Sequence, residues 1–280
     1  MKLAKFIFTS FWGLLAMQST FAADCPMGVA ITASTICTVP AGVAQVRIEA
    51  WGGGGGGGQK NEETETAGGG GGGGAYCAAS FPVSPGNSLT VNIGLGGMAD
   101  TAGGNTSVSG SGVSGLVANG GGPGSTVYTN VNGPWEDYSV GGPGGSIDSC
   151  TATSPTPFAG GNGAIGSGSG SDNPRNGGGG GSAATPSGNG NAGNGRNPGS
   201  GNNGYGADFS GTFSPSTQGS MGGGGGGGIR GGAPSVGGPG QVILTAIAAP
   251  TAIPTLSEWA LICLSGLLGL FAAGIIRRRL

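Results

Sequence analysis

Carboxylates are the main candidates for acid–base chemistry in this sequence, and they are scattered along it. Histidine, the commonest general base and metal ligand, is absent from all 280 residues. A glycosidase needs two carboxylates facing across a cleft, whereas the adjacent Glu136 and Asp137 would point to opposite faces of a strand. The remaining acids of the body occur singly or in one short loop: Asp24, Glu49, Glu62, Glu63, Glu65, Asp100, Asp148, Asp172 and Asp208. We therefore expect no enzyme, no cofactor and no metal site.

A short aromatic segment is the best candidate for a ligand contact. Trp135 and Tyr138 flank the two adjacent acids and follow a Gly-Pro pair. Aromatic rings on loops can stack on sugars or enter partner pockets. In the alternative interpretation both rings cap a small core. The first interpretation would make the protein a carbohydrate-binding surface module.

Four cysteines are candidates for disulfides, because a fifth, Cys263, falls in an apolar C-terminal segment. The candidates are Cys25, Cys37, Cys77 and Cys150. Four cysteines allow three pairings, and proximity in sequence favours Cys25 with Cys37 and Cys77 with Cys150. Each bond would add about 2 to 4 kcal/mol to a body with little apolar core. Their spacing lacks the short pairs typical of zinc ligands.

Residues 1–22 have the order of a secretory signal peptide. Lys2 and Lys5 precede an apolar run, and Thr20-Phe21-Ala22 supplies a small-residue site, so cleavage is expected after Ala22. Export would place the cysteines in an oxidising compartment, where disulfides form and persist.

The other end of the chain predicts a membrane anchor. Residues 259–276 carry no charge and would span about 27 Å as a helix, enough to cross a hydrocarbon core. Three arginines follow and favour the cytoplasmic side: Arg277, Arg278 and Arg279. Trp259 suits the outer interface. The body would then face away from the cytoplasm.

The segment before this helix carries a specific motif: Ile253, Pro254, Thr255, Leu256 and, three positions later, Trp259. With the apolar span and the arginines, it resembles the IPTL-CTERM sorting domain, which is associated with exosortase-type membrane enzymes in Gram-negative bacteria. The resemblance implies that a sorting enzyme recognises the motif, removes the helix and passes the body to the cell surface or matrix. Ala260 stands where the family commonly has glycine, one small residue for another.

Alternating and β-rich segments predict a mainly β body. In 43–51, Val46, Ile48 and Ala50 alternate with Arg47 and Glu49, as on a half-buried strand. We expect segment 29–39 to pair with it, and 75–83 to form a hairpin with 89–95 around Pro85-Gly86-Asn87. Weaker strands are 106–108, 116–118 and 126–128, and 241–247 would close the sheet. The predicted fold is a sandwich or jelly-roll-like body plus one transmembrane helix.

Glycine dominates the rest, with 71 glycines and 17 prolines but no collagen-like period. Three runs have seven glycines each: 52–58, 68–74 and 222–228. Glycine is costly to order, so the runs could be flexible linkers. Alternatively they stack as extended polyglycine helices, because backbones without side chains can approach and hydrogen-bond.

The order of the strand at 43–51, a glycine run and the segment Phe81-Pro82-Val83 resembles glycine-rich domains of bacterial surface proteins and phage tail-tip adhesins. The resemblance covers roughly 37–124 and resumes at 237–245. It implies display and contact more than catalysis.

Together these features predict a signal peptide (1–22), a glycine-rich β body (23–248), a linker with the sorting motif (249–258), a membrane helix (259–276) and a basic tail (277–280). The body has a formal charge of about −6 (11 acids against 5 bases) and no basic face for nucleic acid. The predicted function is that of an exported surface or matrix protein with a structural or adhesive role. Its expected partners are the sorting enzyme, the inner membrane and an extracellular polysaccharide or surface partner.

Overall fold

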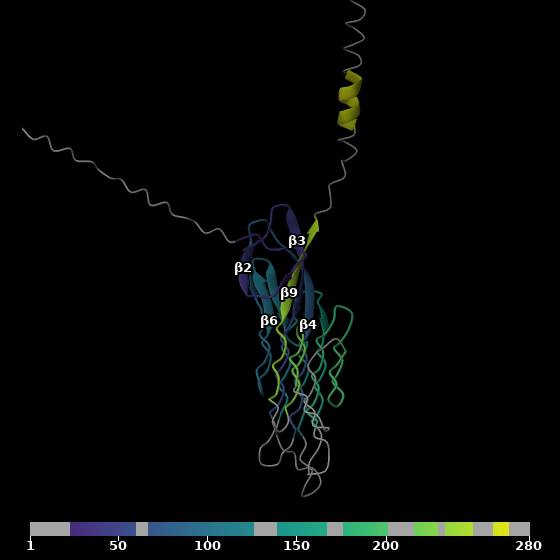
Figure 1. Ribbon diagram of the computed structural model, residues 1–280. Coiled ribbons are helices and arrows are strands. Elements are labelled where there is room, and N and C mark those ends of the chain that lie inside the picture. Colours follow the sequence, from purple (N-terminus) through teal and green to yellow (C-terminus); the bar gives the residue numbers. More distant parts are fainter. Residues whose placement is uncertain are drawn as a thin grey trace, which may run out of the picture.

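The computed structural model describes residues 23–59, 67–125, 139–166, 176–200, 216–228, 233–248 and 260–268. Within them, the chain folds into two antiparallel β-sheets that pack face to face, so the mainly β, sandwich-like prediction is confirmed. Glycine-rich segments extend from one end of this sandwich (Figure 1).

The first sheet has the strand order β1 (Ala30–Ile31), β9 (Gln241–Ala248), β3 (Val43–Trp51), β4 (Tyr76–Pro82) and β8 (Thr156–Phe158). The alternation predicted for β3 is present, because Val46, Ile48 and Ala50 are fully buried. β9 pairs with β3 over nearly its whole length, so the prediction that it closes the sheet is confirmed. β8 was not predicted, since it is short and contains Pro157, which suits its place at the sheet edge.

The second sheet has the order β2 (Thr35–Thr38), β5 (Ser88–Asn92), β6 (Thr106–Gly110) and β7 (Val113–Ala118). One core lies between the sheets. Its fully buried side chains come from both: Ile48 and Leu244 from the first, and Leu89, Val91 and Leu116 from the second.

The expected pairing of segment 29–39 with β3 is wrong. Its first part, β1, pairs with β9, and its second part, β2, pairs with β5 in the other sheet. The segment thus crosses from one sheet to the other, so that Ile31 and Cys37 both reach the common core. β9 is longer and places Val242 and Leu244 in the core beside β3.

The expected hairpin between β4 and β5 is also wrong, although its turn exists. Gly86 has a φ of +81°, and Asn87 closes the turn by donating to Ser84 and accepting from it through its side chain. The turn also hydrogen-bonds to Val39 in both directions. The chain therefore passes between the sheets here, and Phe81 and Leu89 meet in the core rather than side by side in one sheet.

The two ends of the first sheet have different neighbours. Val43 pairs with Ala248 at one end, and Trp51 pairs with Gln241 at the other, where the chain enters the first glycine run. The glycine-rich segments are thus at the end of the sandwich opposite to Ala248, after which the chain continues toward the predicted anchor (Figure 1).

Residues 260–268 are helical with exposed side chains. Among the described residues, no helix has the length and apolar character needed to cross a membrane. The predicted span 259–276 extends beyond the described residues, as do the predicted signal peptide, the strand at 126–128 and the tail.

Candidate functional site in the glycine-helix bundle

The first glycine run lies inside a bundle of extended segments. Every third amide donates to the same neighbour: Gly52, Gly55 and Gly58 to segment 69–75, Gly53 and Gly56 to 101–104, and Gly54 and Gly57 to 235–238. These N···O distances are 2.7 to 3.0 Å. A period of three residues is that of a polyproline II type helix, which has three residues per turn and no internal hydrogen bonds.

The carbonyls of this run are used in the same way. They accept from three further segments, 97–100, 121–124 and 225–228. The helix 52–58 is therefore hydrogen-bonded on all sides, which satisfies its buried backbone groups without a β-ladder.

The second run, 68–74, is a second central helix of the bundle. Its amides donate to 222–228, to 119–125 with the help of Ala75, and to 161–164. Its carbonyls accept from 178–184, from 142–145 and from the first run. The third run lies beside both, because its amides donate to the first run and its carbonyls accept from the second.

Backbone contact of this kind requires glycine. A Cβ atom on Gly54 would overlap the carbonyl oxygen of Gly223, and one on Gly73 would overlap that of Ser182. The obstructing atoms belong to the backbone and cannot rotate away. Of the two interpretations of the glycine runs, stacked polyglycine helices describe the structure, and flexible linkers do not.

Polar side chains accept from some bundle amides that have no backbone carbonyl as a partner within the described part of the chain. The carbonyl oxygens of the Asn105 and Asn162 side chains accept from the amides of Gly120 and Gly144 at 2.9 and 2.8 Å. Ser139 Oγ accepts from Gly166, and the carboxylate of Asp100 accepts from Gln59. Sequence reasoning missed these caps, because nothing distinguishes them from the other asparagines and serines of the low-complexity segments.

An aromatic cluster joins the bundle to the sandwich. The rings of Trp51 and Tyr76 lie 4.9 Å apart between centroids, and Phe158 stacks on Tyr76 at 6.2 Å. Trp51 Nε1 donates to the carbonyl oxygen of Ala184 at 3.0 Å. Beside it lies a mostly apolar hollow of about 270 Å³, lined in part by Met221. Sequence reasoning did not single out these residues as a group.

Tyr76 also organises the charges on this face of the first sheet. Its hydroxyl donates to Glu49 Oε1, and Arg47 Nη2 lies 3.7 Å from the same oxygen. Burial of the Tyr76 side chain, and next its hydrogen bond to Glu49, raise the pKa of Tyr76 above its ordinary value. The tyrosine thus stays neutral as a hydrogen-bond donor at physiological pH.

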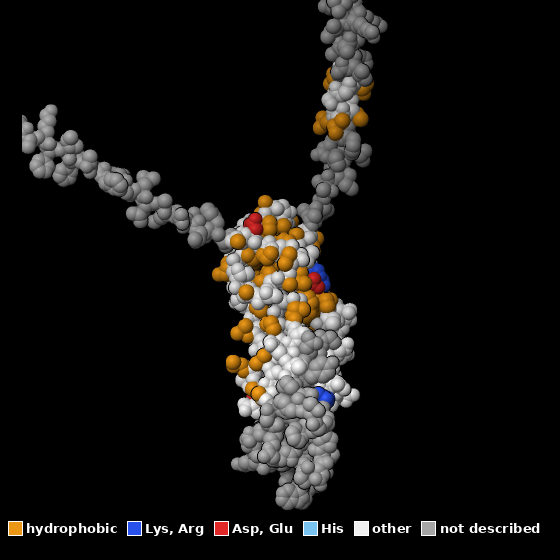
Figure 2. Space-filling model, in the orientation of Figure 1, with side chains coloured by type: hydrophobic (Ala, Val, Ile, Leu, Met, Phe, Trp, Pro, Cys, Tyr) orange, Lys and Arg blue, Asp and Glu red, His pale blue; other side chains and the backbone are white. Residues whose placement is uncertain are grey.

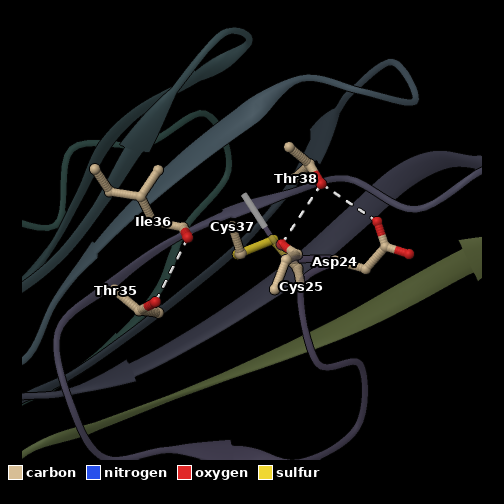
Figure 3. Close-up of a disulfide and its surroundings, with 7 residues drawn as sticks. Asp24, Cys25, Thr35, Ile36, Cys37 and Thr38 are labelled. Atoms are coloured by element: carbon tan, nitrogen blue, oxygen red, sulfur yellow. Dashed lines mark hydrogen bonds between the residues drawn. A yellow bond between two sulfur atoms is a disulfide. The ribbon is translucent and has the colours of Figure 1, made fainter. Parts of the chain in front are cut away.

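The two cysteine pairs favoured by the sequence are disulfides in the structure. Cys25 joins Cys37, and Cys77 joins Cys150. Figure 3 shows the first bond beside Thr38, whose hydroxyl donates to Asp24 and Ala23. This bond ties the first described residues to β2, and the second ties β4 to the loop after the bundle segment 139–145.

Four carboxylates of the body lie within the described part of the chain: Asp24, Glu49, Asp100 and Asp148. No group of three His, Cys, Asp or Glu side chains there could hold a metal ion. Glu136, Asp137 and the predicted ligand contacts Trp135 and Tyr138 lie outside the described residues. The same holds for the sorting motif from Ile253 to Trp259 and for Arg277 to Arg279.

Comparison with protein families confirms both resemblances drawn from the sequence. Residues 30–247 match the glycine-rich domain family, which is well over half of the chain, and residues 251–279 match the IPTL-CTERM motif. No curated protein matches the chain. The first match covers the sandwich with its bundle, and the second covers the segment that follows β9.

Proposed function

The chain belongs to the glycine-rich domain family, and from this premise we propose that it is a structural or adhesive protein displayed at the outer surface of the cell. The IPTL-CTERM motif is that of a C-terminally sorted, exported protein and implies processing by an exosortase-type enzyme. The two disulfides fit an exported, oxidising location. The structural or adhesive role is the step that we add.

The observation that carries this proposal is the direction of the bundle. β9 leaves the sandwich at Ala248, only a few residues before the motif at 251–279, and the glycine helices extend from the opposite end. A body held at its C-terminal end would therefore present the bundle outward. In this topology the span 259–276 predicted from the sequence would cross the inner membrane until sorting, and Arg277 to Arg279 would keep its end in the cytoplasm.

The bundle is suited to a passive, durable role. The backbone groups of its central glycine runs are paired with those of neighbouring segments, and its described segments carry few charged side chains (Figure 2). A backbone whose amides and carbonyls are occupied in this way offers little extended chain to a protease. We propose that it serves as a stiff spacer or contact surface.

Sorting is tested by intact-mass measurement of the protein from the envelope and culture medium of its native host. We expect a species that starts at Ala23 and ends within 253–259. Pro254→Ala and Trp259→Ala should leave the C-terminal tail on the protein, whereas Ser257→Ala, at a variable position of the motif, should be processed normally. A wild-type protein that keeps Arg277 to Leu280 in the inner membrane would contradict sorting.

The role of the displayed body is tested separately, by attachment of cells with and without the protein to surfaces and to one another. We expect attachment to fall in cells that lack the protein. Expression of the Trp135→Ala variant in those cells should restore attachment to the level of the wild type. Binding to a glycan array that Trp135→Ala abolishes would instead establish the carbohydrate-binding module.

A further inference from the structure

One outer segment of the bundle, 95–98 with the turn that follows it, leaves most of its backbone amides without a hydrogen-bond partner. In segment 95–100, the amides of Gly97 and Asp100 donate to the first glycine run at 2.8 and 3.1 Å. The amides of Leu95, Gly96, Met98 and Ala99 have no hydrogen-bond partner within the described part of the chain, whereas three carbonyls of the segment accept from the amides of Gly104, Gly237 and Thr101. In the central helix 52–58, by contrast, every amide donates to a neighbouring segment.

The same segment exposes large apolar side chains. Leu95 is 75% exposed and Met98 is 71% exposed, and a spacing of three residues places them on one side of a threefold helix, about 9 Å apart. The adjoining segment, bonded through Gly237 to Gly97, adds the partly exposed Val236. We call Leu95, Met98 and Val236 the edge patch. Figure 2 shows hydrophobic side chains along one edge of the bundle.

We propose that the edge patch is a self-association surface and that its occupant is a second copy of this chain. The interfaces inside the bundle are made by extended segments side by side, and this outer segment continues that arrangement with open donors. Unpaired backbone groups at an exposed edge are a template for pairing with another chain, as at the edge of a β-sheet. An apolar surface at such an edge favours the same outcome.

The charges of this segment are compatible with a second copy of the chain as the partner. The charged residue of the segment is Asp100, and its carboxylate already accepts the amide of Gln59 at 3.0 Å. Two copies would therefore meet without placing free like charges in contact. A twofold axis along the bundle makes the surface self-complementary and keeps both bodies pointing the same way, with Leu95 against Leu95 and Met98 against Met98. Lateral pairing would join displayed bodies side by side, a role beyond display itself.

The experiment is cross-linking of the full chain in cells that export it. Met98→Cys, in a Cys263→Ser background, is treated with a short bismaleimide, and Ser187→Cys, an exposed position on another part of the bundle, is the matched control. We expect a cross-linked dimer for Met98→Cys and none above background for Ser187→Cys. Adding Leu95→Asp should lower the dimer fraction by about tenfold, because each interface would carry two such changes.

Folding of each variant is checked by the protection of its two native disulfides from alkylation without reductant. Leu95 and Met98 are exposed, so these changes should leave both disulfides protected. Equal cross-linking at both positions, or none at Met98→Cys in protected protein, would overturn the proposal. A product that joins this chain to a different protein would also overturn it, since the surface would then serve another partner. None of these cross-linking results depends on whether the C-terminal tail is cleaved.

Discussion

The amide nitrogen of Gly55 donates to the carbonyl oxygen of Gly72 at 2.8 Å. The two residues belong to different glycine runs, so this bond joins the two central helices of the bundle directly through their backbones. A Cβ atom on Gly55 would overlap the carbonyl oxygen of Gly122, and one on Gly72 would overlap that of Pro143. The helices of the bundle can thus pack this closely only because glycine has no side chain.

Gly55→Ala should destabilise the protein strongly. The added methyl group meets backbone atoms that can move only if neighbouring helices separate, which breaks several hydrogen bonds at once. We expect the free energy of unfolding to fall by about 3 kcal/mol or more, at the upper end of the cost of overpacking. Chemical denaturation followed by circular dichroism and intrinsic fluorescence measures this change.

The matched control is Gly188→Ala. Nothing lies within 4 Å of a Cβ atom built on Gly188, and its φ is not in the left-handed region. Its free energy of unfolding should stay within about 0.5 kcal/mol of the wild type. Equal losses for the two variants would show that close backbone packing is not what makes Gly55 necessary.

The two disulfides should differ in their contribution to stability. Cys77 and Cys150 are separated by 73 positions in sequence, whereas Cys25 and Cys37 are separated by 12. The bond between Cys77 and Cys150 therefore restricts the unfolded chain more. In the loop-entropy treatment, double replacement by Ala should cost about 4 kcal/mol for the long loop and about 3 kcal/mol for the short one. Thermal unfolding of the two double variants tests the order, and a larger loss from the short loop would contradict it.

Trp51→Phe should weaken the junction between the sandwich and the bundle. The change keeps an aromatic ring beside Tyr76 but removes the buried hydrogen bond to the carbonyl of Ala184, at a cost of about 1 to 3 kcal/mol. Hydrogen exchange should rise first in segment 178–184, which packs beside this junction. Uniform loss of protection across both sheets would instead indicate a general loss of the core.

Local patterns in the sequence were enough for much of the sandwich. The alternation of Val46, Ile48 and Ala50 predicted the buried face of β3, and the apolar run ending at Ile247 predicted the closing strand. The sequence did not show which strands pair with each other. A turn such as that at Gly86 has the same residues whether the strands it joins pair in one sheet or lie in two different sheets. The hairpin prediction failed for that reason.

The bundle shows a different limit. The three runs of equal length suggested stacking, but which segments surround Gly55 depends on long-range packing that a repeated residue cannot encode. Most of the outer segments, such as 161–164 and 235–238, are mixed in composition and bind the central helices through their backbone carbonyls. The disulfides were predictable because few cysteines exist, whereas the caps from Asn105 and Asn162 had many equivalent candidates.

The last prediction concerns alkaline pH and Tyr76. Its pKa is raised in the folded protein, first by burial and then by the hydrogen bond to Glu49, whereas the unfolded tyrosine titrates near pH 10. The folded state therefore holds its proton where the unfolded state releases it. By linkage, the contribution of Tyr76 to stability is intact below about pH 10 and is lost progressively as the pH rises above that value.

Tyr76→Phe isolates this contribution. At neutral pH the variant should be less stable by about 1 to 3 kcal/mol, because Glu49 loses a donor and keeps Arg47 at 3.7 Å. Above about pH 10 the difference between the two proteins should shrink, since the variant has no phenol to titrate at this position. Urea unfolding at a series of pH values from 7 to 11 measures both quantities. The remaining tyrosines affect the two proteins alike, so a difference that stays constant across this range would mean that Tyr76 releases its proton equally easily in both states.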